Sequence, residues 1–236
     1  MEIILSYMFE SISGTNGEEP PLIQWGGSYQ ATFYCLHFFI FWRDYIMGIF
    51  APMGISESGT AVREKNDYYA THPRAMEDLL KRELFAPNIW EPACGEGNLS
   101  EVLKKQGYNV YSTDLIDRGY QDEVLDFLET TIKFDGDIIT NPPFKYTNQF
   151  ILRALDSVPM GGKVAMFLKL NYLSGKQRYR DIFSKFPPYR VYVYSGRIAC
   201  SKNNTPEGFK AGAMDYAWYV WEKGKIGPTD LKWIYE

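Results

Sequence analysis

A short apolar stretch in DIITNPPF, residues 137–144, runs directly into an amide, two prolines and an aromatic ring. Pro142 and Pro143 fix the backbone φ angle at two successive positions, and the first of them holds Asn141 extended. We expect a rigid turn in which the side-chain oxygen of Asn141 and the carbonyl of Pro142 both face a pocket as hydrogen-bond acceptors. Phe144 would add a ring on which a flat base can stack. A turn that merely ends a strand is the alternative interpretation.

Two acceptors side by side suit an exocyclic amino group, because such a group carries two protons. Holding both N–H bonds withdraws the nitrogen lone pair from the conjugated ring and directs it towards an electrophile. No strong general base is then required, since positioning and electrostatic complementarity supply most of the rate. A duplex buries the amino group of adenine, so an adenine substrate would have to be flipped out or single-stranded.

A second group of informative residues surrounds a glycine-rich turn that follows the apolar stretch 88–93. Gly95-x-Gly97-x-x-Ser100 is one residue away from the dinucleotide-binding fingerprint, which is a weak signal by itself. The glycines would let the backbone pass close to a ligand. Asp114 follows Gly95 by 19 residues, at the end of the next apolar stretch. A carboxylate there either accepts the hydroxyls of a ribose or caps a helix.

Glu91 bears on the choice between two nucleotide ligands. A carboxylate just before the glycine-rich turn would meet a pyrophosphate unfavourably, and it would suit a positively charged amino group. S-adenosylmethionine carries an adenosine, an ammonium and a sulfonium, and it has no phosphate. The acidic pocket therefore favours S-adenosylmethionine over NAD as the cofactor.

Hydrophobic periodicity from Lys65 onward predicts alternating strands and helices. Strands are expected at residues 88–93, 108–114, 136–141, 163–170, 189–198 and 215–223, and helices at residues 75–84, 99–107 and 147–158. Pro73 marks a helix start, Gly107 a helix end, and Thr147 or Asn148 a helix N-cap. The alternation predicts an α/β fold with a mostly parallel sheet, completed by an antiparallel pair of the last two strands. Ligands of such sheets bind at the carboxyl ends of the strands, where the polar groups above would lie.

The charge of the chain is unevenly distributed. The formal net charge is -4, which excludes a protein that is basic throughout. Residues 161–210 nevertheless hold ten Lys and Arg against two acidic residues, a balance of +8, whereas residues 1–60 hold one basic residue against six acidic ones, a balance of -5. A local basic region fits a polyanionic partner such as DNA, although a solvated surface has the same composition.

Three cysteines, odd in number and far apart, and only two histidines are present in the chain. This usage predicts neither a disulfide framework nor a metal site, and it favours a reducing, cytoplasmic location.

The first sixty residues differ in character from the rest. The apolar run ATFYCLHFFIFW, residues 31–42, is too short for a membrane-spanning helix, and the acidic start of the chain is unlike a secretory signal. We therefore expect no membrane partner. We divide the chain into an atypical N-terminal extension, residues 1–60, and a catalytic domain, residues 61–236. The extension either forms an extra aromatic-rich cap, is disordered, or lies outside the working protein.

The motifs EPACGEG, STD, LDF and NPPF, in this order, resemble those of the N6-adenine DNA methyltransferases. The segments DYYATHPRAMEDLL, IITNPPFKY, YVYSGRIAC and YAWYVWEKG are similar to the small phage and prophage adenine methyltransferases. The resemblance runs from Asn66 to the C-terminus. It implies a Rossmann-like class I methyltransferase fold, with a mostly parallel seven-stranded sheet, an antiparallel C-terminal hairpin and helices on both faces.

The resemblance also implies roles for the residues that match the motifs of the family. The catalytic motif would consist of Asn141, Pro142, Pro143 and Phe144. The cofactor would be bound by Tyr69, Thr71, Glu91, Ala93, Cys94, Gly95, Gly97, Asp114, Asp126 and Phe127. Within that set, Tyr69 and Thr71 match the segment that closes over the methionine end, whereas Asp126 and Phe127 match the partners of the cofactor adenine.

Sequence-specific members of this family usually carry a sizeable target-recognition region, and no long extra domain is visible in this sequence. The candidates for contact with nucleic acid lie in the basic stretch: Lys169, Arg178, Arg180, Arg197 and Lys202.

Residue chemistry and resemblance together predict S-adenosylmethionine-dependent methylation of the N6 amino group of adenine in DNA, with double-stranded DNA as the expected substrate. Adenine in RNA is an alternative acceptor, because Phe at the position of Phe144 is also frequent in RNA enzymes. A protein glutamine amide is another, since it can use the same acceptors. A third alternative is a catalytically idle module that binds nucleic acid or cofactor.

Overall fold

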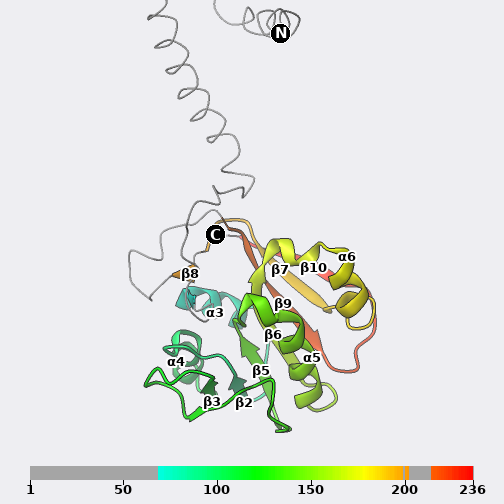
Figure 1. Ribbon diagram of the computed structural model, residues 1–236. Coiled ribbons are helices and arrows are strands. Elements are labelled where there is room, and N and C mark those ends of the chain that lie inside the picture. The colour runs from blue at the N-terminus through cyan, green and yellow to red at the C-terminus, as the bar shows by residue number, and fades with distance from the viewer. Residues whose placement is uncertain (1–68, 199, 202–213, 236) are drawn as a thin grey trace, which may run out of the picture. The chain divides into compact units, whose positions relative to one another are not determined.

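The computed structural model describes residues 69–198, 200–201 and 214–235, which all belong to one compact unit of the chain. Its centre is an eight-stranded sheet in the order β10-β7-β9-β6-β5-β2-β3-β4 (Figure 1). The strands are β2 (Asn88–Glu91), β3 (Asn109–Asp114), β4 (Glu123–Val124), β5 (Asp137–Thr140), β6 (Lys163–Lys169), β7 (Arg190–Tyr194), β9 (Tyr216–Glu222) and β10 (Asp230–Ile234). The proposed division at residue 60 lies outside the described residues and stays a prediction.

Five of these strands form a doubly wound, Rossmann-like half. β4, β3, β2, β5 and β6 are mutually parallel and lie side by side, so their order in the chain is 3-2-1-4-5. In such a sheet the order reverses between the first and the fourth strand, here β2 and β5, and a crevice opens at their carboxyl ends. The predicted α/β fold with a mostly parallel sheet is therefore confirmed.

The remaining strands extend the sheet beyond β6. β9 pairs antiparallel with both β6 and β7, which confirms the predicted antiparallel pair. β10 pairs parallel with β7 at the edge and gives the sheet one strand more than the seven expected. A separate ribbon joins β1 (Ala70–Thr71) antiparallel to β8 (Cys200–Ser201), and no periodicity in the sequence pointed to it.

Helices cover both faces of the sheet, as expected. On one face α3 (Pro73–Leu80) and α4 (Asn98–Lys105) pack through residues such as Met76 and Leu103 against Ile139. On the other face α5 (Thr147–Ser157) packs through Ile151 against Ile138. Successive strand residues point to opposite faces, so the adjacent Ile138 and Ile139 belong to the two different cores. Shorter helical segments are η3 (Phe144–Tyr146), η4 (Leu170–Leu173), α6 (Lys176–Arg178) and η5 (Tyr179–Phe183).

Most helix-boundary signals hold. α3 begins at Pro73, with the Nδ1 atom of His72 accepting from Arg74 N at 3.1 Å, and Gly107 follows α4 with a φ angle of +90°. The expectation that Thr147 or Asn148 caps α5 is wrong. Tyr146 occupies the N-cap position without a side-chain bond, because η3 leads directly into α5 and Thr147 is already its first residue.

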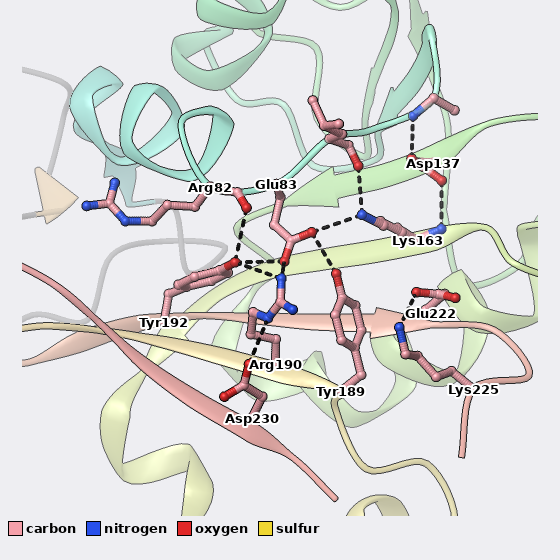
Figure 2. Close-up of polar contacts among 12 residues, drawn as sticks. Arg82, Glu83, Asp137, Lys163, Tyr189, Arg190, Tyr192, Glu222, Lys225 and Asp230 are labelled. Atoms are coloured by element: carbon pink, nitrogen blue, oxygen red, sulfur yellow. Dashed lines mark hydrogen bonds and ion pairs between the residues drawn. The ribbon is translucent and has the colours of Figure 1, made fainter. Parts of the chain in front are cut away.

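A buried charge cluster joins the amino ends of β6 and β7 to the segment after α3 (Figure 2). The carboxylate of Glu83 accepts from Lys163 Nζ at 2.9 Å, Arg190 Nη1 at 2.5 Å and the hydroxyl of Tyr189 at 2.6 Å. Burial alone would raise the pKa of Glu83, but the hydrogen bonds from Tyr189, Lys163 and Tyr192 outweigh it and hold that pKa below its ordinary value. The cluster lies at the amino ends of the strands, opposite the crevice, where we expect the loss of one partner to destabilise the fold.

Within the described ranges, no helix is long and apolar enough to cross a membrane. The apolar run of residues 31–42 lies outside those ranges.

Candidate active site

A cavity of about 740 Å³ lies at the carboxyl ends of β2, β3 and β5. Twelve of the fourteen residues predicted for catalysis and cofactor binding contribute to its lining: Tyr69, Thr71, Glu91, Ala93, Cys94, Asp114, Asp126, Phe127, Asn141, Pro142, Pro143 and Phe144. Segments that are up to 75 residues apart in the sequence therefore meet at the crevice of the doubly wound sheet. Their individual roles stay predictions.

The side chain of Asn141 is held at the cavity wall by three neighbours. Its Nδ2 donates to Thr71 Oγ1 at 2.9 Å and to the carbonyl of Tyr69 at 3.2 Å, and Cys200 Sγ lies 3.9 Å away. Its Oδ1 is shielded from solvent and has no hydrogen-bond partner. A buried acceptor without a donor is costly and uncommon, so this oxygen has unused capacity for a donor from a ligand. A ligand must displace a covering group to reach it.

The ring of Phe144 already has neighbours. It stacks on Tyr69 with the centroids 5.7 Å apart, and Lys169 Nζ lies 4.4 Å from its centroid. Tyr216 is tilted against it at 6.4 Å. A base that stacks on Phe144, as the sequence predicts, must therefore share the ring with Tyr69 and Lys169 or displace one of them.

The glycine-rich turn is tied to Asp114. Gly95 N donates to Asp114 Oδ2 at 2.9 Å, and Ile116 N donates to Oδ1 at 2.9 Å. The carboxylate thus organises both the turn after β2 and the turn after β3. An ionised carboxylate has about four lone-pair sites, so acceptor capacity for ribose hydroxyls is left.

The role in cofactor binding that was expected for Gly95 and Gly97 stays a prediction. Neither Gly95 nor Gly97 lines the cavity, although both have a positive φ angle. A Cβ atom on Gly97 would lie 2.2 Å from Cζ of Tyr120. The missing side chain of Gly97 therefore makes room for the Tyr120 ring.

Glu91 is buried at 2% exposure at the end of β2. Ser100 Oγ donates a short hydrogen bond to Glu91 Oε2, and Ser112 Oγ lies 2.8 Å from Ser100 Oγ. Burial raises the pKa of Glu91 to about 8. The Glu91 side chain is therefore mainly protonated at physiological pH and ionises when a positive charge lies beside it. The sequence had led us to expect a carboxylate that is ionised without a ligand. Burial also raises the pKa of the neighbouring Cys94 thiol, so Cys94 is no thiolate nucleophile.

Asp126 and Phe127 follow β4 and also line the cavity. Asp126 Oδ1 accepts from Leu128 N at 2.9 Å, which fixes the turn after β4. Phe127 packs mainly into the core, with its ring 5.0 Å from both Trp90 and Phe150. Phe127 is only 2% exposed, so little of its side-chain surface can contact a ligand.

The predicted nucleic-acid contacts lie outside the cavity lining. Arg178 Nη1 donates to the carbonyls of Asn171 and Ser174, at 2.8 and 2.5 Å. The Arg178 guanidinium therefore binds the backbone of the segment that precedes it. Arg180 pairs with Asp181 at 3.1 Å on the surface, and Arg197 Nε lies 3.9 Å from Asp215. Asp181 is already included in the sequence balance of +8, so Asp215 is the one acidic partner among these contacts that lies outside that count. Lys202 lies outside the described residues.

Sequence reasoning did not single out four residues of this region. Arg118, Lys145 and Tyr146 line the cavity, and Cys200 lies beside Asn141. Lys145 and Tyr146 directly follow the NPPF turn, so extending that motif by two residues would have found them. Arg118 and Cys200 carry no local signal, because only the tertiary fold brings them to the site. Among the described residues, no group of three or more His, Cys, Asp or Glu could hold a metal ion. The expectation that the protein binds no metal stays a prediction.

Comparison with known proteins gives weak similarities. No protein-family model and no curated protein matches the sequence. A solved structure from Listeria monocytogenes, proposed to be a class I S-adenosylmethionine-dependent methyltransferase, has a TM-score of 0.49 and 14% identity over 76% of this chain and 68% of its own. A protein proposed to be an RNA methyltransferase, from Pyrococcus horikoshii, has a TM-score of 0.47 and 16% identity over 73% and 96%. The M protein of the type I restriction enzyme EcoKI has a TM-score of 0.47 and 14% identity over 69% and 45%. At these levels of similarity, a function for this chain has to be inferred from its own strand order and side chains.

Proposed function

We propose that this protein methylates the N6 amino group of adenine in DNA with S-adenosylmethionine as the methyl donor. The observation that carries the proposal is the buried, unpartnered Oδ1 of Asn141, held at the crevice of a doubly wound sheet beside an aromatic ring. An acceptor kept without a donor is what an amino-group substrate requires.

The residues of the cavity fit the proposed cofactor. Asp114 has acceptor capacity left for ribose hydroxyls, and Glu91 can ionise beside an ammonium group. A cavity of about 740 Å³ falls in the size range of small-molecule sites. When bound, S-adenosylmethionine supplies an electrophilic methyl group on a sulfonium, and methyl transfer to nitrogen leaves a neutral thioether and releases one amino proton.

The chain's own contribution is to bind and orient the amino group. Asn141 Oδ1 would accept one N–H bond of the substrate, and the carbonyl of Pro142 would accept the other. Both acceptors favour the form of the nitrogen whose lone pair is free to attack. Phe144 stacks on Tyr69 at the cavity wall, and a flipped-out base would stack on Phe144 by displacing Tyr69 or Lys169 or by sharing the ring with them. No side chain is required as a strong base, because the proton leaves from a nitrogen that has become positively charged.

The test is methyl transfer from labelled S-adenosylmethionine to double-stranded DNA, single-stranded DNA and RNA in parallel, with the products digested to nucleosides. We expect N6-methyldeoxyadenosine from DNA. Label in RNA alone would move the assignment to adenine in RNA. Cofactor binding without transfer to any of the three polymers would overturn the proposal and leave a protein glutamine or an idle binding module.

A further inference from the structure

The β1–β8 ribbon contacts the amide of Asn141 from one side. Thr71 and Cys200 are register partners in this ribbon, and both lie within contact distance of Asn141 Nδ2. The carbonyl of Tyr69, directly ahead of β1, is the third neighbour of the same nitrogen. Three groups from two distant segments therefore converge on one end of the amide.

The chemistry of these neighbours determines which end of the amide faces them. A backbone carbonyl can only accept a hydrogen bond, so the group opposite Tyr69 must be the NH₂ end of Asn141. Thr71 Oγ1 offers lone pairs to the same nitrogen at 2.9 Å, while its hydroxyl also contacts Cys200. The oxygen of the amide is consequently left on the side away from the ribbon.

We propose that Thr71 is a positioning residue that keeps the Oδ1 atom of Asn141 directed to the substrate amino group. Thr71 is 3% exposed and its hydroxyl is the nearest acceptor of Asn141 Nδ2. Without it, Asn141 Nδ2 would keep the Tyr69 carbonyl at 3.2 Å and a weakly accepting sulfur at 3.9 Å. A loosened amide can turn its NH₂ end to the substrate, and two donors would then face each other.

This inference rests on the proposed function, and it differs from the role expected for Thr71 from sequence. A residue that closes over the methionine end of the cofactor affects cofactor affinity. A residue that orients Asn141 affects the transfer rate and leaves cofactor affinity unchanged. The two roles are separable by measuring both quantities on the same variant.

The experiment compares Thr71→Val, Thr71→Ser and Thr140→Val in the full chain. Thr140 is a matched control, because it is buried one residue before Asn141 and its Oγ1 has no partner. We expect Thr71→Val to lower the single-turnover transfer rate by about 10-fold or more, the worth of a lost buried hydrogen bond. Cofactor affinity by calorimetry should stay unchanged. Thr71→Ser should restore the rate, and Thr140→Val should retain it.

An altered cofactor affinity with an unchanged transfer rate in Thr71→Val would overturn the inference, as would an unchanged value of both. If the wild-type protein transfers no methyl group, the proposed function fails, and the inference is then tested by NMR. The side-chain NH₂ signals of Asn141, assigned by their loss in Asn141→Ala, should be protected from exchange with water. Thr71→Val should remove this protection, and retained protection would contradict the positioning role.

Discussion

Asp114 Oδ2 accepts a hydrogen bond from the backbone nitrogen of Gly95 at 2.9 Å, across 19 residues of sequence. This bond joins the turn after β2 to the turn after β3 and places the carboxylate at the cavity wall. One side chain thus shapes the glycine-rich turn and offers acceptors to a ligand.

Removing the charge of Asp114 should weaken cofactor binding. In Asp114→Asn the side chain keeps its shape but loses charge-assisted acceptance, so we expect the Kd for S-adenosylmethionine to rise by about 10- to 100-fold. Calorimetry measures this change. Asp117→Asn is the control, because Asp117 is an exposed carboxylate on the same loop that also accepts a backbone N–H. Equal Kd values for wild type and Asp114→Asn would exclude Asp114 from the cofactor site.

The ionisation of Glu91 should make cofactor affinity depend on pH. Its pKa is about 8 in the ligand-free protein, and a bound ammonium favours the charged form, so binding below that pH releases a proton. We expect affinity to rise as the pH approaches about 8 and then to level off. Calorimetry in buffers of different ionisation enthalpy counts the released proton. In Glu91→Gln the release should disappear, and a release that persists would assign it to another group.

The same carboxyl predicts the sign of a stability effect. Because its pKa in the folded protein lies above the unfolded value, its contribution to the free energy of unfolding is fully present below a pH of about 4.5 and is lost as the pH rises through about 8. Ligand-free Glu91→Gln should therefore gain stability relative to wild type above that range.

Gly97 should not tolerate a side chain. Gly97→Ala places a methyl group against the Tyr120 ring. The left-handed backbone at this position lowers the free energy of unfolding of the variant by about 1–2 kcal/mol more. Gly119→Ala is the matched control, since Gly119 has a φ angle of +78° and nothing within 4 Å of the added Cβ. Denaturant unfolding should show a larger loss for Gly97→Ala. Equal losses would mean that Tyr120 moves aside without cost.

Glu83 should matter for stability and not for the cavity. Glu83→Gln leaves Lys163 and Arg190 partly buried without their carboxylate, so we expect a loss of about 3 kcal/mol in the free energy of unfolding. For a protein of this size the melting temperature should fall by roughly 6–12 °C. Asp181→Asn, which removes the surface pair with Arg180, should change little. An unchanged melting temperature in Glu83→Gln would contradict the role given to the cluster.

The parts of the fold that were predictable are those with strong local signals. β6 and β9 are continuous apolar runs, and the helices have clear periodicity and boundary residues. β10 was missed because DLKWI is largely exposed, so its side chains do not form an apolar pattern. β1 and β8 contain two residues each, too few for any period.

The candidate site was predictable where a few consecutive residues supply all the groups that one chemical role requires. NPPF combines an acceptor, a rigid turn and a ring within four residues, and the doubly wound order explains why Asp114 lies near it. Contacts between distant residues were not predictable. The Tyr120 ring over Gly97 and the bond from Asn141 to Thr71 span 23 and 70 residues, and they depend on how loops return over the sheet.

If Asn141 Oδ1 accepts a hydrogen bond from the substrate amino group, Asn141→Ala should abolish this contact and slow the transfer step. The measurement is the single-turnover rate of methyl transfer to adenine in DNA, with the cofactor Kd determined on the same preparation. We predict a rate lowered by at least about 100-fold, as for the loss of one preorganised group at a reacting centre, with the Kd nearly unchanged. A rate close to that of the wild type would contradict the account.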